Sequence, residues 1–373
     1  MRLLKHSFFC LVYALFSQAA YGLSSFSEIK PNLEEISKEY FRADYKNLSS
    51  EDFDIKWQES LESPLLFFRS YVKTWYREFS TLKSVGPIGY CLGDAHPENF
   101  GYLWRQDGSY PYVFNDLDDS GLCPIAADAL RYLIALSLYT QDGDLVEQVA
   151  SEYARVLKGG ENRKLPIWAY KSWQKKNEKN LKKYVEGATL KPGKLEKVQP
   201  EERLIIESAL KGMLPSFYMV QDVASYVKTS GGSAGLKRYW ILVEDKNASI
   251  RDILELKPYL QPATYHERWA LPSDHNDPLT AAAFIYGKQM DLVSFGQVTI
   301  DNRLYQLRSR TKSDLDLEDL SFAEQEEIFL LQVGLIAKHH RRYVKDVDTL
   351  TKWLSSQVSL ATHRYLDIYH NAL

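Results

Sequence analysis

Residues 93–101 read GDAHPENFG and lie between two short apolar stretches, 88–92 and 112–114. Within this segment Asp94 and Asn99 are five positions apart, and Pro97 stiffens the chain between them. A carboxylate in such a loop can accept a proton from an attacking hydroxyl, while the amide oxygen of an asparagine can bind a divalent cation. The spacing therefore predicts a catalytic loop with Asp94 and His96 as catalytic candidates and Asn99 as a metal ligand.

A second, acidic loop follows at residues 114–121, which read FNDLDDSG. It comes after a predicted strand, and a carboxylate at Asp116 or Asp118 could bind the metal ion that bridges the phosphates of a nucleotide. Such a loop after a catalytic-loop spacing is far less common by chance than either feature alone. We therefore expect Asn99, Asp116 and Asp118 to bind Mg²⁺, and ATP to be the nucleotide.

Three other interpretations of these loops stay open. The acidic loop could be a calcium loop of the EF-hand kind starting at Asp116, but Ala127 then stands where a bidentate glutamate is required. Asp94 and His96 could be ligands of a hydrolytic metal ion, although no histidine-rich partner motif follows. Both loops could also be turns rich in aspartate and glycine that carry no chemistry.

Three segments together resemble one known family: GDAHPENFG at 93–101, VFNDLDDSG at 113–121 and AADALRYL at 126–133. They look like the bacterial family catalogued as domain of unknown function 2252, which is related to protein-kinase-like folds, including aminoglycoside and choline phosphotransferases. The resemblance spans about residues 60–345. It implies that Asp94 is the catalytic base, that Asn99 and Asp116 bind metal, and that Asp128 is structural. Arg69 matches a further family segment without an assignable role.

The order of the parts differs from that of ordinary kinases, in which a glycine-rich loop and a lysine strand precede the catalytic loop. Here the segment GGSAG at 231–235 follows it and stands before a predicted strand, 236–243, and Lys257 ends a further strand. Backbone N–H groups of glycines can approach phosphate oxygens, and a lysine on a neighbouring strand can pair with them. An ordinary hairpin turn is the alternative. The expected nucleotide-binding residues are Gly231, Gly232, Ser233, Gly235 and Lys257.

The sequence departs from that of kinases at two positions, and it contains two further polar segments. Leu92 stands where kinases often have histidine, and Tyr286 stands where some family members have an acidic partner for the lysine, so we expect Lys257 to pair with Asp116 or another group. His339 and His340 are expected on a polar helix face. The nine lysines between residues 171 and 197 indicate a solvated helix face, with a docking surface for an anionic partner as the alternative.

These observations predict an α+β, protein-kinase-like fold of two lobes in circularly permuted order, with a mostly helical large lobe and a small antiparallel sheet. We expect a signal peptide at 1–22, a helical lobe with both loops at 23–220, a β-rich nucleotide-binding lobe at 221–310, and C-terminal helices at 311–373 that pack on the helical lobe. Residues 143–220 are expected to be helical and polar. Strands are expected at 223–227, 236–243, 253–256 and 304–307, and helices at 124–139 and 280–293.

The composition is that of an ordinary globular protein, with 373 residues, 45% hydrophobic and 25% charged, which excludes a mainly disordered or fibrous chain. The formal charge of −3 gives no global basicity that would recruit nucleic acid. Arg2 and Lys5, an apolar run at 8–16 and small residues at 20 and 22 predict a cleaved signal peptide, with an uncleaved anchor as the alternative. The mature protein is therefore expected to be secreted or periplasmic and without a membrane span.

Two cysteines, Cys91 and Cys123, remain after such a cleavage, and an oxidising compartment would permit a disulfide between them. The bridge requires Cα atoms within about 7 Å.

The function expected from this sequence is transfer of a phosphoryl group from ATP with Mg²⁺ to a hydroxyl of a small molecule or protein. A non-catalytic extracytoplasmic binding protein on the same scaffold is an alternative, because ATP is scarce outside the cytoplasm and one fold hosts many functions. Nucleotidyl transfer is a further alternative. The sequence leaves the oligomeric state open.

Overall fold

The computed structural model describes residues 22–30, 32–46, 48–103, 111–193, 195–214, 216, 218–227, 236–246, 250–269, 278–286, 295–309 and 315–373. The expected signal peptide lies outside these residues except for Gly22. The expected phosphate-binding residues Gly231, Gly232, Ser233 and Gly235 also lie outside them.

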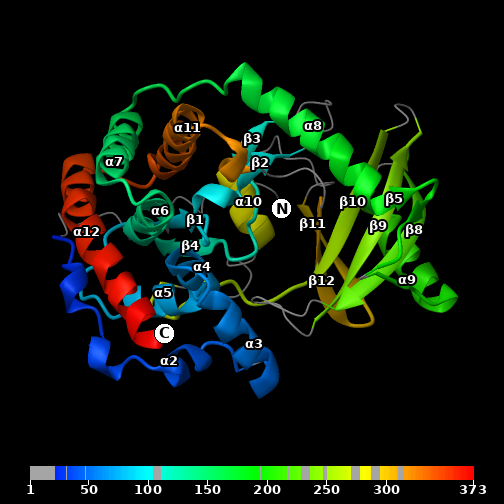
Figure 1. Cartoon of the computed structure of the whole chain (residues 1–373), viewed down its shortest axis with the longest axis horizontal. Coiled ribbons are helices and arrows are strands. Elements are labelled where there is room, and N and C mark those ends of the chain that lie inside the picture. Colours follow the sequence, from blue (N-terminus) through cyan, green and yellow to red (C-terminus); the bar gives the residue numbers. More distant parts are fainter. Residues whose placement is uncertain are drawn as a thin grey trace, which may run out of the picture.

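The architecture is α+β, as predicted, with a helical body and an antiparallel sheet (Figure 1). The chain enters the body through short helices, in agreement with the helical periodicity before residue 85. Ser63 begins one of them, because its hydroxyl accepts the Leu66 N–H at 3.1 Å and Pro64 fits the first turn. These helices are α2 (Lys38–Arg42), α3 (Ser50–Ser60), α4 (Pro64–Ser70) and α5 (Val72–Phe79).

The centre of the body is the almost wholly buried helix α6 (Ile125–Thr140), predicted at 124–139. Around it pack three amphipathic helices, whose apolar faces join one large core with α4 and α5. A capping box of Ser321 and Glu324 fixes the start of the first C-terminal helix. The three helices are α7 (Gly143–Leu157), α11 (Phe322–His340) and α12 (Val347–Ala372).

Among the described residues, six strands form the main sheet, in the order β11-β12-β10-β9-β8-β7, and every pair is antiparallel. Side chains alternate between its two faces. Ile241 and Val243 pack against helix α9 (Pro200–Leu210), while Trp240 and Leu242 pack on the opposite face. The strands are β7 (Glu196–Lys197), β8 (Tyr218–Val227), β9 (Lys237–Asp245), β10 (Ile250–Pro258), β11 (Phe295–Ile300) and β12 (Arg303–Ser309).

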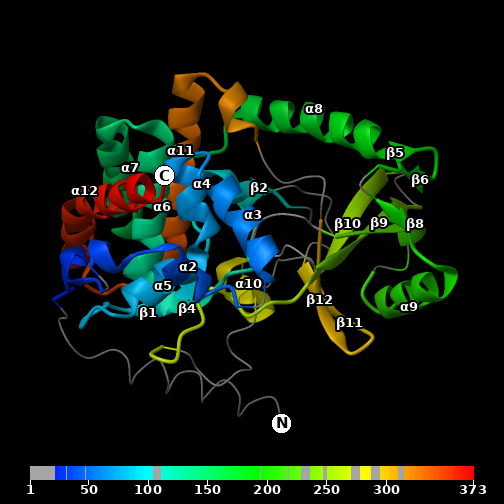
Figure 2. The same ribbon diagram turned by 60° about the horizontal axis from the view of Figure 1, so that its bottom comes forward.

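Residues 143–220 are not helical throughout, which corrects the prediction. Helix α8 (Ile167–Tyr184) runs from the body to the sheet (Figure 2), and α9 (Pro200–Leu210) covers one sheet face. Between them the chain forms the hairpin of β5 (Val185–Glu186) and β6 (Thr189–Leu190) and then strand β7. The lysine-rich segment is therefore only partly helical, because Leu190 has to pack on the sheet beside Trp240.

The chain returns to the helical body between β10 and β11. Helix α10 (Pro278–Tyr286) packs beside strands β1 (Ile88–Cys91) and β4 (Gly121–Pro124) of the body. Phe284 stacks on Tyr90 with ring centroids 4.2 Å apart. Ala263 and Trp269 belong to the same large core. The sheet and the body are thus connected by several chain segments as well as by α8.

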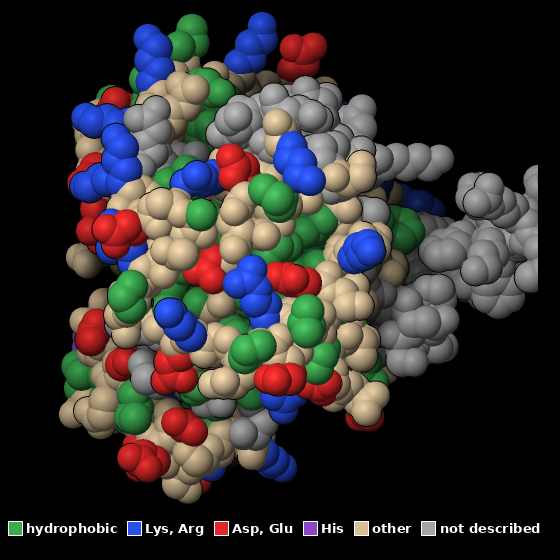
Figure 3. Space-filling model, turned by 90° about the vertical axis from the view of Figure 1, so that its right-hand side faces the viewer, with side chains coloured by type: hydrophobic (Ala, Val, Ile, Leu, Met, Phe, Trp, Pro, Cys, Tyr) green, Lys and Arg blue, Asp and Glu red, His purple; other side chains and the backbone are tan. Residues whose placement is uncertain are grey.

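The outer side of the sheet carries side chains of both charge signs. Figure 3 shows lysine and arginine side chains interspersed with aspartate and glutamate across the face that includes α9. An example is the ion pair between Lys237 of β9 and Glu202 of α9, at 2.6 Å. Within the described part of the chain, every helix is too short or too polar to cross a bilayer.

Candidate active site

Two pairs of short strands hold the two predicted loops side by side. Strand β1 (Ile88–Cys91) leads into the catalytic loop and β2 (Phe100–Tyr102) follows it, while β3 (Tyr112–Phe114) leads into the acidic loop and β4 (Gly121–Pro124) follows that. Because β1 pairs with β4 and β2 pairs with β3, the loops lie at the same edge. The Asn115 N–H also donates to the Asn99 carbonyl at 2.9 Å.

Gly93 is required where the two loops meet. Its φ of 90° lies in the region that favours glycine, and a Cβ atom there would overlap the backbone carbonyl of Asp119. The first glycine of GDAHPENFG therefore lets the catalytic loop pass directly against the acidic loop.

The carboxylate of Asp94 forms an ion pair with Arg131 of helix α6. Arg131 is fully buried, and its Nη2 and Nε atoms donate to Asp94 Oδ1 at 2.6 and 3.2 Å. Burial alone would raise the pKa of Asp94, but Arg131 and then His96 outweigh it and hold the pKa far below its usual range. Asp94 is therefore ionised near neutral pH, and it is a weak proton acceptor.

His96 and Asn99 support the loop from inside. His96 is buried, its Nε2 lies 3.5 Å from Asp94 Oδ2, and its Nδ1 accepts the Glu98 N–H at 3.2 Å. Burial and the nearby Arg69 lower the pKa of His96, so its ring is neutral near pH 7. The Asn99 amide donates to the Asp94 carbonyl at 2.9 Å. Both residues therefore shape the loop around Asp94.

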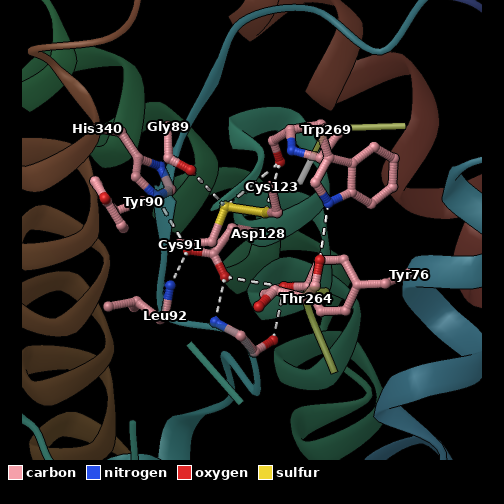
Figure 4. The surroundings of a disulfide bond; sticks show 12 residues. Tyr76, Gly89, Tyr90, Cys91, Leu92, Cys123, Asp128, Thr264, Trp269 and His340 are labelled. Carbon is pink, nitrogen blue, oxygen red and sulfur yellow. Dashed lines mark hydrogen bonds and ion pairs between the residues drawn. A yellow bond between two sulfur atoms is a disulfide. The ribbon is translucent and has the colours of Figure 1, made fainter. Parts of the chain in front are cut away.

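A buried carboxylate, Asp128, fixes the backbone just before Asp94 (Figure 4). It accepts the N–H groups of Leu92 and Gly93 at 2.9 and 3.1 Å. His340 of α11 lies 3.1 Å from Asp128 with its Nε2 and 2.9 Å from the Tyr153 hydroxyl with its Nδ1. The structural role that the family resemblance implies for Asp128 agrees with these contacts.

The placement of the two histidines corrects a prediction. His339 and His340 were expected on a polar helix face, but both are buried. The Nε2 atom of His339 lies 2.5 Å from the Tyr90 carbonyl of β1. His339 thus connects α11 to the strand that enters the catalytic loop, while His340 connects α11 to Asp128 of α6 and Tyr153 of α7.

An Asp128→Asn substitution is expected to lower the free energy of unfolding by about 1–3 kcal/mol, because one buried backbone N–H would then face an amide donor in place of an acceptor. Urea unfolding followed by circular dichroism measures the loss. Asp142→Asn is the matched control: Asp142 caps α7 by accepting the Leu145 N–H, and asparagine caps equally well. Equal midpoints for the two variants would contradict the role of Asp128.

The structure contains the disulfide between Cys91 and Cys123, with Cα atoms 5.8 Å apart. It joins β1, which enters the catalytic loop, to β4, which leaves the acidic loop, and both cysteines are fully buried (Figure 4). The bridge that the sequence left open is therefore present, and it connects the supports of both loops.

A cavity of about 310 Å³ lies where these loops face the sheet. Alternation along β10 puts Glu255 and Lys257 on the same face as Ile253, and this face turns toward the acidic loop. The cavity's carboxylates are Asp94, Asp116, Asp118 and Asp119. Its cationic side chains are Lys56, Arg69, Lys73, Arg238, Lys257 and Arg308.

Lys257 pairs with Asp118 across the cavity, although 139 positions separate them in the sequence. Arg308 of β12 lies beside it, with Nη1 at 3.3 Å from the carboxylates of both Asp116 and Asp118 and Nη2 at 2.7 Å from Glu255. Burial and the neighbouring Arg308 lower the pKa of Lys257 to about 8, so the amine is still mostly charged at pH 7. The structure thus brings Lys257, Asp116 and Asp118 together.

Among the charged residues of the site that the sequence analysis missed are Arg131, Arg308 and Asp119. Arg131 stands out afterwards as the one basic residue of a largely apolar helix, in which Asp128 is the one acidic residue. Arg308 follows a predicted strand by one position. Asp119 accepts the Ala263 N–H at 2.9 Å, and burial, together with Asp94 and Asp116, raises its pKa to about 6. Asp119 could have been found from the sequence, because it directly follows Asp118 in the acidic loop.

The donor set of the acidic loop fits a hard divalent cation in kind. Asp116 and Asp118 present carboxylate oxygens to the cavity, and Asp118 Oδ1 is buried without a hydrogen-bond donor in the described part of the chain. Carboxylate and amide oxygens are the ligands that Mg²⁺ accepts in proteins. The described residues contain no group of three or more Asp, Glu, His or Cys side chains arranged around one metal position.

Residues 49–211 match the model of a family described as an uncharacterized protein conserved in bacteria, DUF2252. The match includes both loops, Arg131 and Asp128, but ends before the strand that carries Lys257. The chain matches no curated protein and no solved structure. Over the stretch that builds the catalytic and acidic loops, the chain is therefore similar to an uncharacterised bacterial family.

Proposed function

We propose that the protein is a kinase-like phosphotransferase that moves a phosphoryl group from ATP to a hydroxyl of a small-molecule or protein acceptor. The observation that carries this proposal is the ion pair of Lys257 with Asp118, which joins the sheet to the acidic loop across the cavity that also contains Asp94. A phosphate-binding cation and acidic metal ligands facing one space are what phosphoryl transfer needs. We further propose that the fold is a circularly permuted kinase-like one.

Lys257 and Arg308 would hold the phosphates of the nucleotide. In the structure each forms an ion pair with aspartate, and phosphate oxygens could replace these carboxylates as partners. Arg308 presents a planar guanidinium, which suits two oxygens of one phosphate, while Lys257 acts as a point charge. Release of Asp116 and Asp118 would free their carboxylates for a metal ion.

Asn99, Asp116 and Asp118 would hold Mg²⁺, which when bound neutralises charge on the phosphates. Asp94 would accept a hydrogen bond from the acceptor hydroxyl and orient its oxygen toward the γ-phosphorus. The hydroxyl oxygen of the acceptor forms a bond to the γ-phosphorus while the bond between this phosphorus and ADP breaks. The electron pair of the broken bond stays on ADP. The hydroxyl proton, strongly acidic once the new bond forms, passes through Asp94 to water. Positioning, rather than strong basicity, is the contribution of Asp94.

A non-catalytic binding protein is the second candidate. The ion pair with Arg131 favours it, because this pair makes Asp94 a weak proton acceptor. The disulfide also favours an oxidising, extracytoplasmic location, where ATP is scarce. Both candidates require the nucleotide-binding cavity, and only the first requires turnover.

A Lys257→Gln substitution is expected to weaken the binding of ATP with Mg²⁺ by about tenfold or more, because a cation that faces the phosphates is lost. Calorimetric titration of the full chain with ATP, with and without Mg²⁺, measures the change. Lys237→Gln is the matched control, since Lys237 is an ion-paired lysine of the neighbouring strand that lies away from the cavity. Equal affinities of the two variants would end the nucleotide assignment.

A further inference from the structure

The wall of the cavity opposite the sheet is formed by the N-terminal helices. Arg69 and Ser70 end α4, Lys73 lies in the first turn of α5, and all three line the cavity. Lys56 of α3 lies beside them, with its amine 4.8 Å from the ring centre of Tyr45. None of these residues belongs to the catalytic or acidic loop, so the proposed phosphotransfer chemistry leaves this wall without a role.

Positive charge on this wall is less balanced than on the sheet. On the sheet side Arg238, Lys257 and Arg308 all form ion pairs with carboxylates. On the helical wall Arg69 pairs with Glu98, but its Nε is buried without an acceptor in the described residues. Lys73 forms no ion pair there with any described residue. A buried donor without an acceptor is costly, so these groups fit an anionic ligand.

The cations of the two walls contact different loops. Lys257 and Arg308 of the sheet form ion pairs with Asp118 and Asp116 of the acidic loop. Arg69 of the helical wall instead forms its ion pair with Glu98 of the catalytic loop, the loop that contains Asp94. Arg69, with Lys73 beside it on the helical wall, is therefore on the acceptor side of the proposed reaction.

We propose that Arg69, Ser70 and Lys73 form a binding site for an anionic group of the acceptor. The acceptor is then a hydroxyl compound that already carries a phosphate or a carboxylate. This inference rests on the proposed phosphotransfer. It places the anionic group on the helical wall, the hydroxyl at Asp94, and the nucleotide phosphates at Lys257 and Arg308.

The test is a calorimetric titration of the full chain with inorganic phosphate and, separately, with acetate, each before and after saturation with a non-hydrolysable ATP analogue and Mg²⁺. We expect phosphate or acetate to bind the nucleotide-saturated protein. Lys73→Gln should weaken this binding by about tenfold and change the affinity for the analogue by less than about twofold. Lys83→Gln, an exposed lysine just after the same helix, is the control and should change neither. The tighter of the two anions identifies the group on the acceptor.

Three results would overturn the proposal: competition between the anion and the nucleotide analogue, an anion affinity that Lys73→Gln leaves unchanged, or no anion binding at all. The thermal unfolding midpoint of Lys73→Gln should equal that of the wild-type protein. A loss of anion binding then comes from the missing amine and not from unfolding of the variant. Anion binding that depends on Lys73 in a chain that binds no nucleotide would support the anion site and overturn the phosphotransferase instead.

Discussion

The Asp94→Asn variant is expected to lose phosphoryl transfer and, in addition, about 3 kcal/mol of folding stability, because Arg131 would be left as a buried cation without its counter-charge. Arg131 is fully buried while 21% of the Asp94 side chain is exposed, which puts the cost at the lower end for a broken buried pair. From the sequence alone the substitution looks nearly isosteric and harmless to folding. The ion pair with α6 changes that expectation.

Guanidinium unfolding of Asp94→Asn, Arg131→Met and the double variant separates the two effects. If the pair is coupled as its 2.6 Å contact indicates, the double variant should be less destabilised than the sum of the single ones. Turnover should be absent from every variant that lacks Asp94. Full activity in Asp94→Asn would exclude Asp94 from the reaction, and additive stabilities would exclude the structural coupling.

The local elements of this protein could be read from its sequence. The apolar spacing that predicted a helix at 124–139 corresponds to α6 at Ile125–Thr140. The β-branched runs at 223–227 and 253–256 fall within β8 and β10. These patterns record which face of an element is buried, which is a local property. Gly93, the first glycine of GDAHPENFG, similarly reflects a local backbone conformation with positive φ.

The contacts that complete the site could not be read in this way. Lys257 was expected to pair with Asp116 or another group, and only the sheet register, with Arg308 opposite Glu255, shows why it contacts Asp118. The pairing of Arg131 with Asp94 depends on how α6 packs under the loop. Periodicity does not encode such contacts, because they join elements far apart in the chain.

Polar residues in the interior were the least predictable. His340 lies on a segment that reads as polar, yet it bridges Asp128 and Tyr153 in the core. A buried polar side chain requires hydrogen-bond partners from other elements, and the local sequence pattern does not indicate which residues these partners are. The disulfide could be predicted in part. The sequence shows which cysteines are available to pair, but it does not show how far apart they lie in space.

Removal of the disulfide in a Cys91→Ala, Cys123→Ala variant is expected to lower the free energy of unfolding by about 3.7 kcal/mol, the chain-entropy value for a loop of some thirty residues. The two cysteines are 32 positions apart, and the bond restricts chiefly the unfolded chain. In the folded protein the hydrogen bonds between β1 and β4, and those of Asp128 to Leu92 and Gly93, still hold both loops. Nucleotide affinity should therefore change little while stability falls.

Unfolding in urea with and without dithiothreitol provides the measurement and its control. The wild-type protein should approach the midpoint of the variant when the reductant can reach the sulfurs in the unfolded state, and the variant itself should not respond. A wild-type midpoint that is insensitive to reductant would mean that the cross-link contributes nothing to stability. A large loss of nucleotide affinity in the variant would instead assign the disulfide to the geometry of the two loops, since Asp128 alone would then be insufficient to hold them.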